Sequence, residues 1–476
     1  MMPHHQLDLR GKRVLVMGLG TRSGGLGVTR WLVAQGAIVT VTDLRPAEAL
    51  RESLAALEGL PITFVLGQHR EQDFTQADIV VRNPAVPRES PWLALARAAG
   101  ARIEMEMTLF FRACPAPIIG VTGTKGKTTT ATLCAAMLRA WRPDTVLAGN
   151  LGRSALEMLP AIQPDTPVVL ELSSWQLEGL GEHGMSPHIA ILTSISEDHL
   201  DRYPSMAEYI EAKRHIARFQ KPGDWFIVNA DNPIAWSCRH TGQGQLVPFG
   251  RDQGWPTAAV LIGEELYWRR DTVEQRICHR SEIPLAGEHI AWNALAAAAA
   301  ALLRGAPIEA VREGLRQVQP IPHRLEPIAE LNGVLFVNDS AATAPAAVLA
   351  ALQAYRERGI VLIAGGAAKG VDLTPLAEQL AAASHVRAVV LLAGSATPAF
   401  AEALRAAGAP VLGVTYSMEE AVHTAVAHAQ PGDVVLLSPG CASFGLFRDE
   451  FHRGESFRQV VQQLCQQTFH VKEGAG

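Results

Sequence analysis

The 476-residue sequence has few cysteines, no excess of basic charge and no long apolar run, and each absence argues against a class of protein. Its six cysteines are scattered, with no CxxC pair, which speaks against zinc and against a disulfide framework and is typical of a reducing compartment. The formal net charge of −5 argues against a nucleic-acid-binding protein, because such a protein usually presents a basic face. No uncharged apolar stretch reaches the length of a membrane span, and no apolar signal core begins the chain. We therefore expect a cytoplasmic protein with no membrane or nucleic-acid partner.

The length and pattern of the chain predict about three domains of α/β architecture. Buried strands alternate with helices in three successive blocks, which is typical of parallel sheets with helices on both faces. A proline-containing stretch at 114–117 and a second one at 319–322 separate the blocks. The predicted domains are residues 1–113, residues 114–320 and residues 321–476.

The first block opens as a Rossmann-like βαβ unit. A buried strand runs into Gly18 and Gly20, a helix follows, and the next strand ends in Asp43. Two later glycines complete a pattern that resembles a dinucleotide fingerprint, but two or three extra residues separate them from the first pair. Asp43 is placed to accept hydrogen bonds from a ribose or a uracil ring. The block is compatible with NAD, with another nucleotide or with no ligand.

The strongest local signal is a glycine-rich loop between a buried strand at 118–122 and an apolar helix. Backbone N–H groups of such a loop, together with the helix N-terminus, cradle phosphates. Lys127 would reach the β- and γ-phosphates, and the Thr128 hydroxyl would ligate Mg²⁺. Val121 stands where the general P-loop has a glycine, so a plain glycine turn before a helix is the alternative. The predicted triphosphate loop consists of Gly123, Thr124, Lys125, Gly126, Lys127, Thr128 and Thr129.

Two polar side chains follow neighbouring strands of the second block. Glu171 ends a strand at 168–170, and the next strand leads to His199. Because the carboxyl ends of parallel strands face the ligand crevice, Glu171 would point at the phosphate loop. A carboxylate and an imidazole beside a triphosphate suit a divalent ion. For His199 by itself, a capping or surface histidine is the alternative.

Lys213 interrupts the apolar stripe of a helix that begins at Ser205 with the capping pattern Ser-x-x-Glu. Tyr209 lies four residues before it and Ile216 three residues after it, so the three share one face. A buried lysine has a depressed pKa, and its neutral amine can add CO₂ to give a carbamate that ligates metal like a carboxylate. The alternative is a lysine that extends its ammonium to water.

These features occur together, in this order, in the Mur ligase family, which the sequence resembles over essentially its whole length. The segments that carry the resemblance are 120–128, 149–152, 170–177, 197–203, 229–231, 289–293, 323–324, 338–340 and 437–443. The runs LELSSWQL at 170–177 and LSPGCAS at 437–443 favour the glutamate-adding members. The resemblance implies a Rossmann-like UDP-binding domain, a central P-loop ATPase domain and a Rossmann-like C-terminal domain that brings the glutamate.

The resemblance also implies a monomeric, ATP-dependent ligase that uses two Mg²⁺ ions. Such an enzyme joins D-glutamate to UDP-N-acetylmuramoyl-L-alanine through an acyl-phosphate, in peptidoglycan precursor synthesis. By resemblance, the catalytic residues are Lys127 at the γ-phosphate, Glu171 with Thr128 at one Mg²⁺, and His199 with carbamylated Lys213 at the second. The other implied contacts are Asn293, Arg324 and Asp339 for ATP; Gly18, Leu19, Gly20, Asp43, Asn83, Pro84, Asn150 and Ser173 for the UDP substrate; and Thr343, Lys369, Ser443 and Phe451 for glutamate.

The sequence departs from the family pattern in the third block. Ala341 stands where the family usually has a lysine, and the common aspartate after Ser443 is missing. The same ligation with L-glutamate therefore stays open. Two further alternatives are a folylpolyglutamate-type ligase, which lacks a UDP-binding first domain, and a nicotinamide-dependent oxidoreductase or nucleotide-binding regulator. The last pair leaves Glu171, His199 and Lys213 unexplained.

Overall fold

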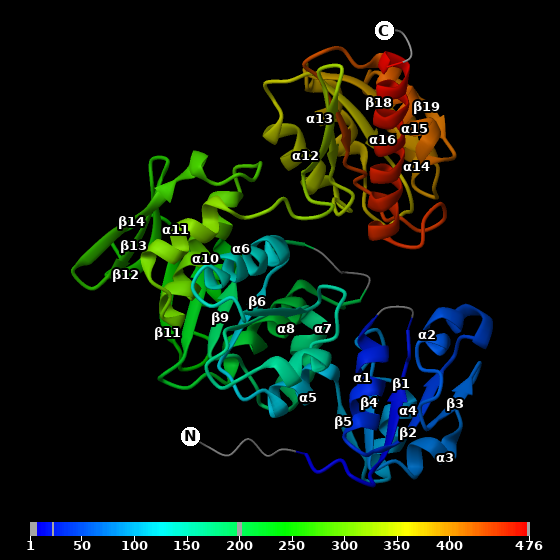
Figure 1. Ribbon diagram of the computed structural model, residues 1–476, viewed down its shortest axis with the longest axis vertical. Coiled ribbons are helices and arrows are strands. Elements are labelled where there is room, and N and C mark those ends of the chain that lie inside the picture. Colours follow the sequence, from blue (N-terminus) through cyan, green and yellow to red (C-terminus); the bar gives the residue numbers. More distant parts are fainter. Residues whose placement is uncertain (1–6, 21–22, 198–201, 474–476) are drawn as a thin grey trace. The chain divides into compact units, whose positions relative to one another are not determined.

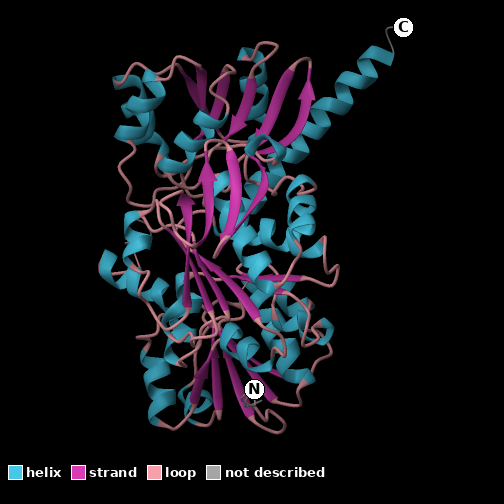
Figure 2. Cartoon of the chain, turned by 90° about the vertical axis from the view of Figure 1, so that its left-hand side faces the viewer, coloured by secondary structure: helices cyan, strands magenta, loops and turns pink. Residues whose placement is uncertain are grey.

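The computed structural model of the protein describes residues 7–20, 23–197 and 202–473. The chain divides into two compact units: residues 1–283 with 291–317, and residues 284–290 with 318–476. Three sheets carry the described part of the fold, two in the first unit and one in the second (Figure 1). Parallel strands dominate each sheet and helices flank them (Figure 2), so the predicted α/β class is confirmed.

The first sheet has five parallel strands in the order β3-β2-β1-β4-β5. Strand β1 is apolar and buried after its first residue, as expected for a parallel strand with both faces covered. The strand order reverses between β1 and β4, where a ligand crevice is expected at the carboxyl ends. The elements are β1 Arg13–Met17, α1 Ser23–Ala34, β2 Ile38–Asp43, η1 Ala47–Leu50, α2 Arg51–Ala55, β3 Ile62–Leu66, α3 Glu71–Thr75, β4 Ile79–Arg82, α4 Pro91–Ala98 and β5 Arg102–Glu104.

The second sheet has nine strands in the order β14-β13-β12-β11-β10-β9-β6-β8-β7. Strand β6 pairs in parallel with both β8 and β9, so the loop that follows β6 begins between the carboxyl ends of these two strands. Strands β12, β13 and β14 form an antiparallel extension that the sequence analysis did not predict. The strands are β6 Ile118–Thr122, β7 Val146–Gly149, β8 Val168–Glu171, β9 Ile189–Leu192, β10 Trp225–Asn229, β11 Gln245–Arg251, β12 Thr257–Ile262, β13 Glu265–Arg270 and β14 Val273–His279.

Helices cover this sheet and include the alanine-rich α10, whose residues 294–301 are fully buried. The helices of this part are α5 Glu106–Ala113, α6 Lys127–Arg139, η2 Leu156–Ala161, α7 Ser174–Glu182, α8 Met206–Arg218, α9 Pro233–Ser237, η3 Arg280–Glu282, α10 Ile290–Arg304 and α11 Ile308–Arg316. In the part of the chain that the structure describes, no helix combines the length and apolar character needed to cross a membrane.

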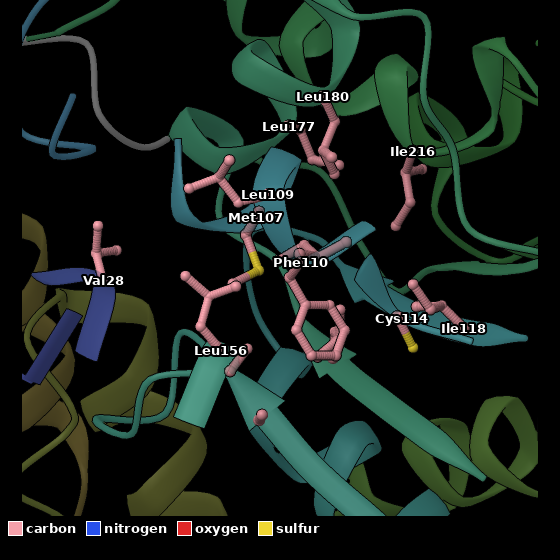
Figure 3. Packing of buried hydrophobic residues seen from close by; sticks show 14 of the residues in the cluster. Val28, Met107, Leu109, Phe110, Cys114, Ile118, Leu156, Leu177, Leu180 and Ile216 are labelled. Atoms are coloured by element: carbon pink, nitrogen blue, oxygen red, sulfur yellow. The ribbon is translucent and has the colours of Figure 1, made fainter. Parts of the chain in front are cut away.

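Helix α5 links the cores of the first two sheets. Met107, Leu109 and Phe110 are almost completely buried, and they belong to the same apolar cluster as Leu177 and Leu180 of α7 (Figure 3). This cluster also includes residues of β1 and β2, so the apolar core is continuous across residue 113. The domain limits predicted at residues 113 and 320 stay predictions.

The second unit carries six strands in the order β15-β16-β20-β17-β18-β19. The buried parallel strands expected of the third block are present and include β17, β18 and β20, whereas the antiparallel pair β15–β16 was not predicted. The long helix α16 ends the described chain (Figure 2). The elements are β15 Glu326–Leu331, β16 Val334–Asn338, α12 Pro345–Ala354, β17 Ile360–Ala364, α13 Thr374–Ala382, β18 Val386–Leu392, α14 Thr397–Ala406, β19 Val411–Thr415, α15 Met418–His428, β20 Val434–Leu437 and α16 Glu450–Glu473.

Candidate active site

The loop between β6 and α6 has a backbone that requires glycine. Gly123 and Gly126 have φ angles of 153° and 85°, which side chains disfavour. A Cβ atom on Gly126 would lie 2.5 Å from Oδ1 of Asn293, so there is no space for a side chain. Gly126 directly precedes the first turn of α6, whose backbone N–H groups lack partners within the helix. The loop therefore has the geometry of an anion-binding helix N-terminus.

Two lysines meet at this loop. The Lys127 Nζ donates to the carbonyl oxygens of Gly123 and Thr124, both at 3.0 Å, and the Lys213 Nζ donates to the Gly123 oxygen at 2.8 Å. Lys213 is only 2% exposed, and its Nζ lies 4.6 Å from the centre of the Tyr209 ring. The Tyr209 hydroxyl in turn lies 3.1 Å from the Thr124 hydroxyl. Lys213 is therefore a buried lysine beside the loop, not a lysine that extends its side chain to water.

A polar cluster lies on the other side of the loop. The Thr128 hydroxyl donates to Oε2 of Glu171 at 2.7 Å, and the Asn150 side-chain amide donates to Oε1 at 3.2 Å. Glu171 is the last residue of β8 and is 2% exposed. Glu171 therefore lies beside the loop, as expected from its position at the carboxyl end of a parallel strand.

The oxygen atoms of Thr128 and Glu171 fit a Mg²⁺ ion. Magnesium prefers hard oxygen ligands and usually takes one or two protein ligands together with phosphate and water. The hydroxyl and the carboxylate already point at one another, since they share a hydrogen bond. Among the described residues, no group of three or more His, Cys, Asp or Glu side chains could hold a metal ion. The predicted ligand His199 lies outside the described residues.

Asn293 of α10 offers an unused hydrogen-bond donor next to the loop. Its Oδ1 accepts from the Thr130 hydroxyl at 3.2 Å, whereas its buried Nδ2 has no hydrogen-bond partner. A buried donor left unpaired costs about 1–3 kcal/mol. Since Asn293 also borders Gly126, this donor fits a ligand that brings an acceptor to the loop, as ATP would.

The residues predicted for the UDP group gather at the carboxyl ends of β1, β2 and β4. The Asn83 side-chain amide donates to the carbonyl oxygen of Gly18 at 3.3 Å, and the Gly20 N–H donates to Asp43 Oδ2 at 3.2 Å. Arg45 donates to both carboxylate oxygens of Asp43, at 3.1 and 3.0 Å. Burial by itself would raise the pKa of Asp43, but the hydrogen bonds from Arg45 and Gly20 outweigh burial and lower it. Arg45 was not predicted from the sequence, where its one signal is its position two residues after Asp43.

Three other residues predicted for the UDP substrate have different surroundings. Leu19 is fully buried in the apolar core, and Pro84 is partly exposed in the turn after β4. Ser173 caps α7 through a reciprocal pair with Gln176: its hydroxyl accepts from the Gln176 N–H at 3.3 Å, and Gln176 Oε1 accepts from the Ser173 N–H at 2.9 Å. This capping box fixes the orientation of the Ser173 side chain, which lies two residues after Glu171 in the chain.

In the second unit, Asp339 follows β16 and is 7% exposed. Its carboxylate accepts from the Ser438 hydroxyl at 2.9 Å and from the Leu325 N–H at 3.2 Å. Burial raises the pKa of Asp339 to about 7, against hydrogen bonds and the charge of Arg324, which lower it. His323 and Leu325, on either side of Arg324, have positive φ angles of 63° and 43°. The two residues predicted for ATP in this unit, Arg324 and Asp339, therefore lie close together.

Three of the residues predicted for glutamate lie on neighbouring loops of the same unit. The Lys369 Nζ donates to the Thr343 hydroxyl at 3.0 Å. The backbones of Ala367 and Ala442 exchange hydrogen bonds of 2.8 and 3.1 Å, which sets the Lys369 loop beside the loop of the buried Ser443.

The fourth residue, Phe451, is on α16 and 48% exposed. Its ring packs edge-on against His323, with 5.8 Å between ring centres. Phe451 therefore lies beside the segment that carries Arg324.

Models of three protein domains match the chain in order. They are the Mur ligase MurD-like N-terminal domain at residues 12–104, the Mur ligase middle domain at residues 121–301 and the Mur ligase glutamate ligase domain at residues 323–441. A UDP-N-acetylmuramoylalanine–D-glutamate ligase from Roseiflexus sp. (strain RS-1) is 54% identical over 467 residues, which cover 96% of this chain and 99% of that protein. A ligase of the same name from Symbiobacterium thermophilum is 41% identical and covers 95% of this chain and 98% of its own.

Solved structures agree on the fold. The UDP-N-acetylmuramate-alanine ligase MurC from Thermotoga maritima covers 96% of this chain and 100% of its own, with a TM-score of 0.61 at 22% identity. A pseudomurein peptide ligase type C from Methanothermus fervidus covers 95% and 100%, with a TM-score of 0.58 at 20% identity. On the domain matches and the 54% identity to a full-length relative, this chain belongs to the Mur ligase family of ATP-dependent acid–amino-acid ligases.

Proposed function

We propose that this chain is the ligase that adds D-glutamate to UDP-N-acetylmuramoyl-L-alanine, with consumption of ATP and release of ADP and phosphate, in peptidoglycan precursor synthesis. The observation that carries the proposal is the pair Thr128–Glu171 at a phosphate loop, in a chain 54% identical to such a ligase from Roseiflexus. We place the reaction in the cytoplasm because both ATP and the UDP-linked substrate are nucleotides. A nicotinamide-dependent oxidoreductase would have no use for this pair.

Each nucleotide-facing residue then has a role. Lys127 would neutralise charge on the γ-phosphate, and Thr128 with Glu171 would hold one Mg²⁺. His199 and a carbamylated Lys213 would hold a second Mg²⁺. The burial of Lys213 supports the carbamate, because burial disfavours a charged ammonium. When bound, Mg²⁺ neutralises charge that develops on the phosphate oxygens. The remaining ATP contacts are Gly123, Thr124, Lys125, Gly126, Thr129, Asn293, Arg324 and Asp339.

The reaction proceeds in two steps. The alanine carboxylate of the UDP substrate attacks the γ-phosphorus of ATP, the bond to ADP breaks, and an acyl-phosphate forms. The amine of glutamate then attacks the acyl carbon, phosphate leaves, and an amide bond forms with loss of a proton. Lys127 acts in the first step, because its ammonium lies at the loop where the phosphate charge must be stabilised. Water must be excluded while the acyl-phosphate exists.

The substrate groups are assigned to separate surfaces. The contacts proposed for the UDP substrate are Gly18, Leu19, Gly20, Asp43, Asn83, Pro84, Asn150 and Ser173. Those proposed for glutamate are Thr343, Lys369, Ser443 and Phe451. Lys369 is the cation proposed to bind a glutamate carboxylate. Its Nζ lies 3.0 Å from the Thr343 hydroxyl, and Ala341, two residues before Thr343, carries no charge. We also expect the enzyme to be a monomer.

Phosphate release tests the proposal directly. Purified protein is given ATP, Mg²⁺ and UDP-N-acetylmuramoyl-L-alanine, with D-glutamate, with L-glutamate or with no amino acid. We expect release with D-glutamate only, and its loss in a Lys127→Met variant. Release with L-glutamate only would assign the choice of isomer to the altered loop around Ala341. If neither isomer supports release, the substrate assignment is wrong.

A further inference from the structure

Arg453 of α16 is fully buried, which is unusual for a long charged side chain. Its guanidinium donates three hydrogen bonds, all to uncharged oxygens: from Nε to the Ser340 hydroxyl at 3.0 Å, and from its two terminal nitrogens to the carbonyl oxygens of Ser340 at 2.9 Å and Cys441 at 3.2 Å. Burial lowers the pKa of Arg453 to about 10. Burial of a cation that bonds only to carbonyl and hydroxyl groups is costly, so we expect Arg453 to have a role other than packing.

The acceptors belong to loops that carry the proposed glutamate contacts. Ser340 lies three residues before Thr343, and Cys441 lies two residues before Ser443. The third loop is also within reach: a Cβ atom on Gly366, three residues before Lys369, would lie 3.5 Å from a terminal nitrogen of Arg453.

The sheet order explains how one side chain reaches all three loops. Ser340 follows β16, Cys441 follows β20 and Gly366 follows β17, and these strands are neighbours in the order β16-β20-β17. Their carboxyl ends therefore lie side by side at one edge. The planar guanidinium presents its donors in a fixed fork, so it can hold several acceptors in a defined arrangement where a flexible lysine cannot.

We propose that Arg453 is the positioning residue that aligns the three loops of the glutamate site, and that it controls glutamate binding without touching glutamate. The inference rests on the proposed function. The effect is assigned to the geometry of the guanidinium and not to its positive charge alone, since its hydrogen bonds go to two of the three loops and its terminal nitrogen lies next to the third.

Arg458, on the same helix, is a matched control. Its terminal nitrogen donates to both carboxylate oxygens of Glu326, at 2.7 and 2.9 Å, and its side chain is 25% exposed. Glu326 begins β15 and is outside the three loops. Replacement of Arg458 removes an arginine contact from α16 but leaves the hydrogen bonds of Arg453 to the loops in place.

The experiment measures the KM for D-glutamate and for UDP-N-acetylmuramoyl-L-alanine in full-length wild type and in Arg453→Met, Arg453→Lys and Arg458→Met. We expect Arg453→Met to raise the glutamate KM at least about 10-fold and to leave the KM of the UDP substrate within about twofold, because small displacements of binding groups are costly. Arg453→Lys keeps the charge without the fork and should resemble Arg453→Met. Arg458→Met should leave both constants near wild type. Should Arg453→Met fail to fold, Ser340→Ala removes one acceptor of the fork and should raise the glutamate KM alone, by a smaller factor.

Hydrogen exchange of the same proteins provides a readout that needs no turnover. Loss of the fork should speed exchange at residues 339–343, 366–369 and 441–443, and should leave the rest of the second unit at wild-type rates. An unchanged glutamate KM with exchange raised throughout the unit would overturn the inference and make Arg453 a general stabilising residue. A wild type that releases no phosphate with D-glutamate would overturn the proposed function instead, and the exchange pattern would still decide whether Arg453 aligns the loops.

Discussion

Replacement of Asp339 by asparagine tests whether this carboxyl is held protonated by the fold. Burial raises its pKa to about 7 from an ordinary value of 3.8. A carboxyl whose pKa is raised on folding stabilises the native state while it is protonated, and that contribution is lost as the pH rises through the native pKa. The second unit should therefore become less stable between pH 5 and pH 8, and the asparagine variant should lack this loss.

The magnitude follows from the two pKa values. At pH 5 the native carboxyl is mostly protonated and the unfolded one mostly ionised, which contributes about 2.7 kcal/mol of stability. At pH 8 the contribution falls below about 0.1 kcal/mol, so wild type should lose about 2.6 kcal/mol relative to the variant. His323, whose pKa burial lowers, titrates in both proteins and cancels in the comparison.

Thiol labelling can follow the second unit selectively. Tryptophan fluorescence cannot, since all nine tryptophans lie at or before Trp292. Cys441 is buried in the second unit and Cys134 in the first, so both react after opening of their own unit. With 4,4′-dithiodipyridine in dilute urea, the ratio of wild-type to variant rates at Cys441 should rise about 90-fold from pH 5 to pH 8. The ratio at Cys134 should not change. A flat ratio at Cys441 would refute the raised pKa.

Three other predictions concern the first unit. Lys127→Met should lower phosphate release at least about 100-fold with little change in binding of the UDP substrate, because its ammonium serves the transferring phosphate; single-turnover kinetics and calorimetry separate the two. Thr128→Val should raise the Mg²⁺ concentration needed for half-maximal activity, since it removes one oxygen ligand. An unchanged half-maximal Mg²⁺ concentration in a Mg²⁺ titration would contradict that role. Burial raises the pKa of Glu106 to about 7, so wild type should lose stability as the pH rises from 5 to 8. Glu106→Gln should flatten this dependence in urea titrations followed by tryptophan fluorescence, and parallel curves would contradict the assignment.

The parallel strands were predictable because their signal is local. Strands such as β1 and β17 are buried on both faces and read as short continuous apolar runs. The antiparallel strands lack that signal: the first four residues of β14 are exposed, and β15 has a single buried residue. Their pairing depends on tight turns and on neighbouring strands, so these strands were not predictable from local sequence.

The sequence by itself determined the parts of the site whose requirements are local. A glycine loop after a buried strand predicts a phosphate site, because positive φ angles and exposed helix N–H groups arise within a few residues. Glu171 was predictable from its place at a strand end, and Lys213 from the apolar stripe that it interrupts.

Only the tertiary structure decided which distant groups meet and how deeply they are buried. Arg453 bonds to Ser340 from 113 residues away, and Asn293 reaches Thr130 across 163 residues. The raised pKa of Asp339 likewise depends on the packing of the whole second unit. Such contacts leave no mark in local sequence, because strand order and helix packing set the distances between residues far apart in the chain, and burial sets the cost of charge.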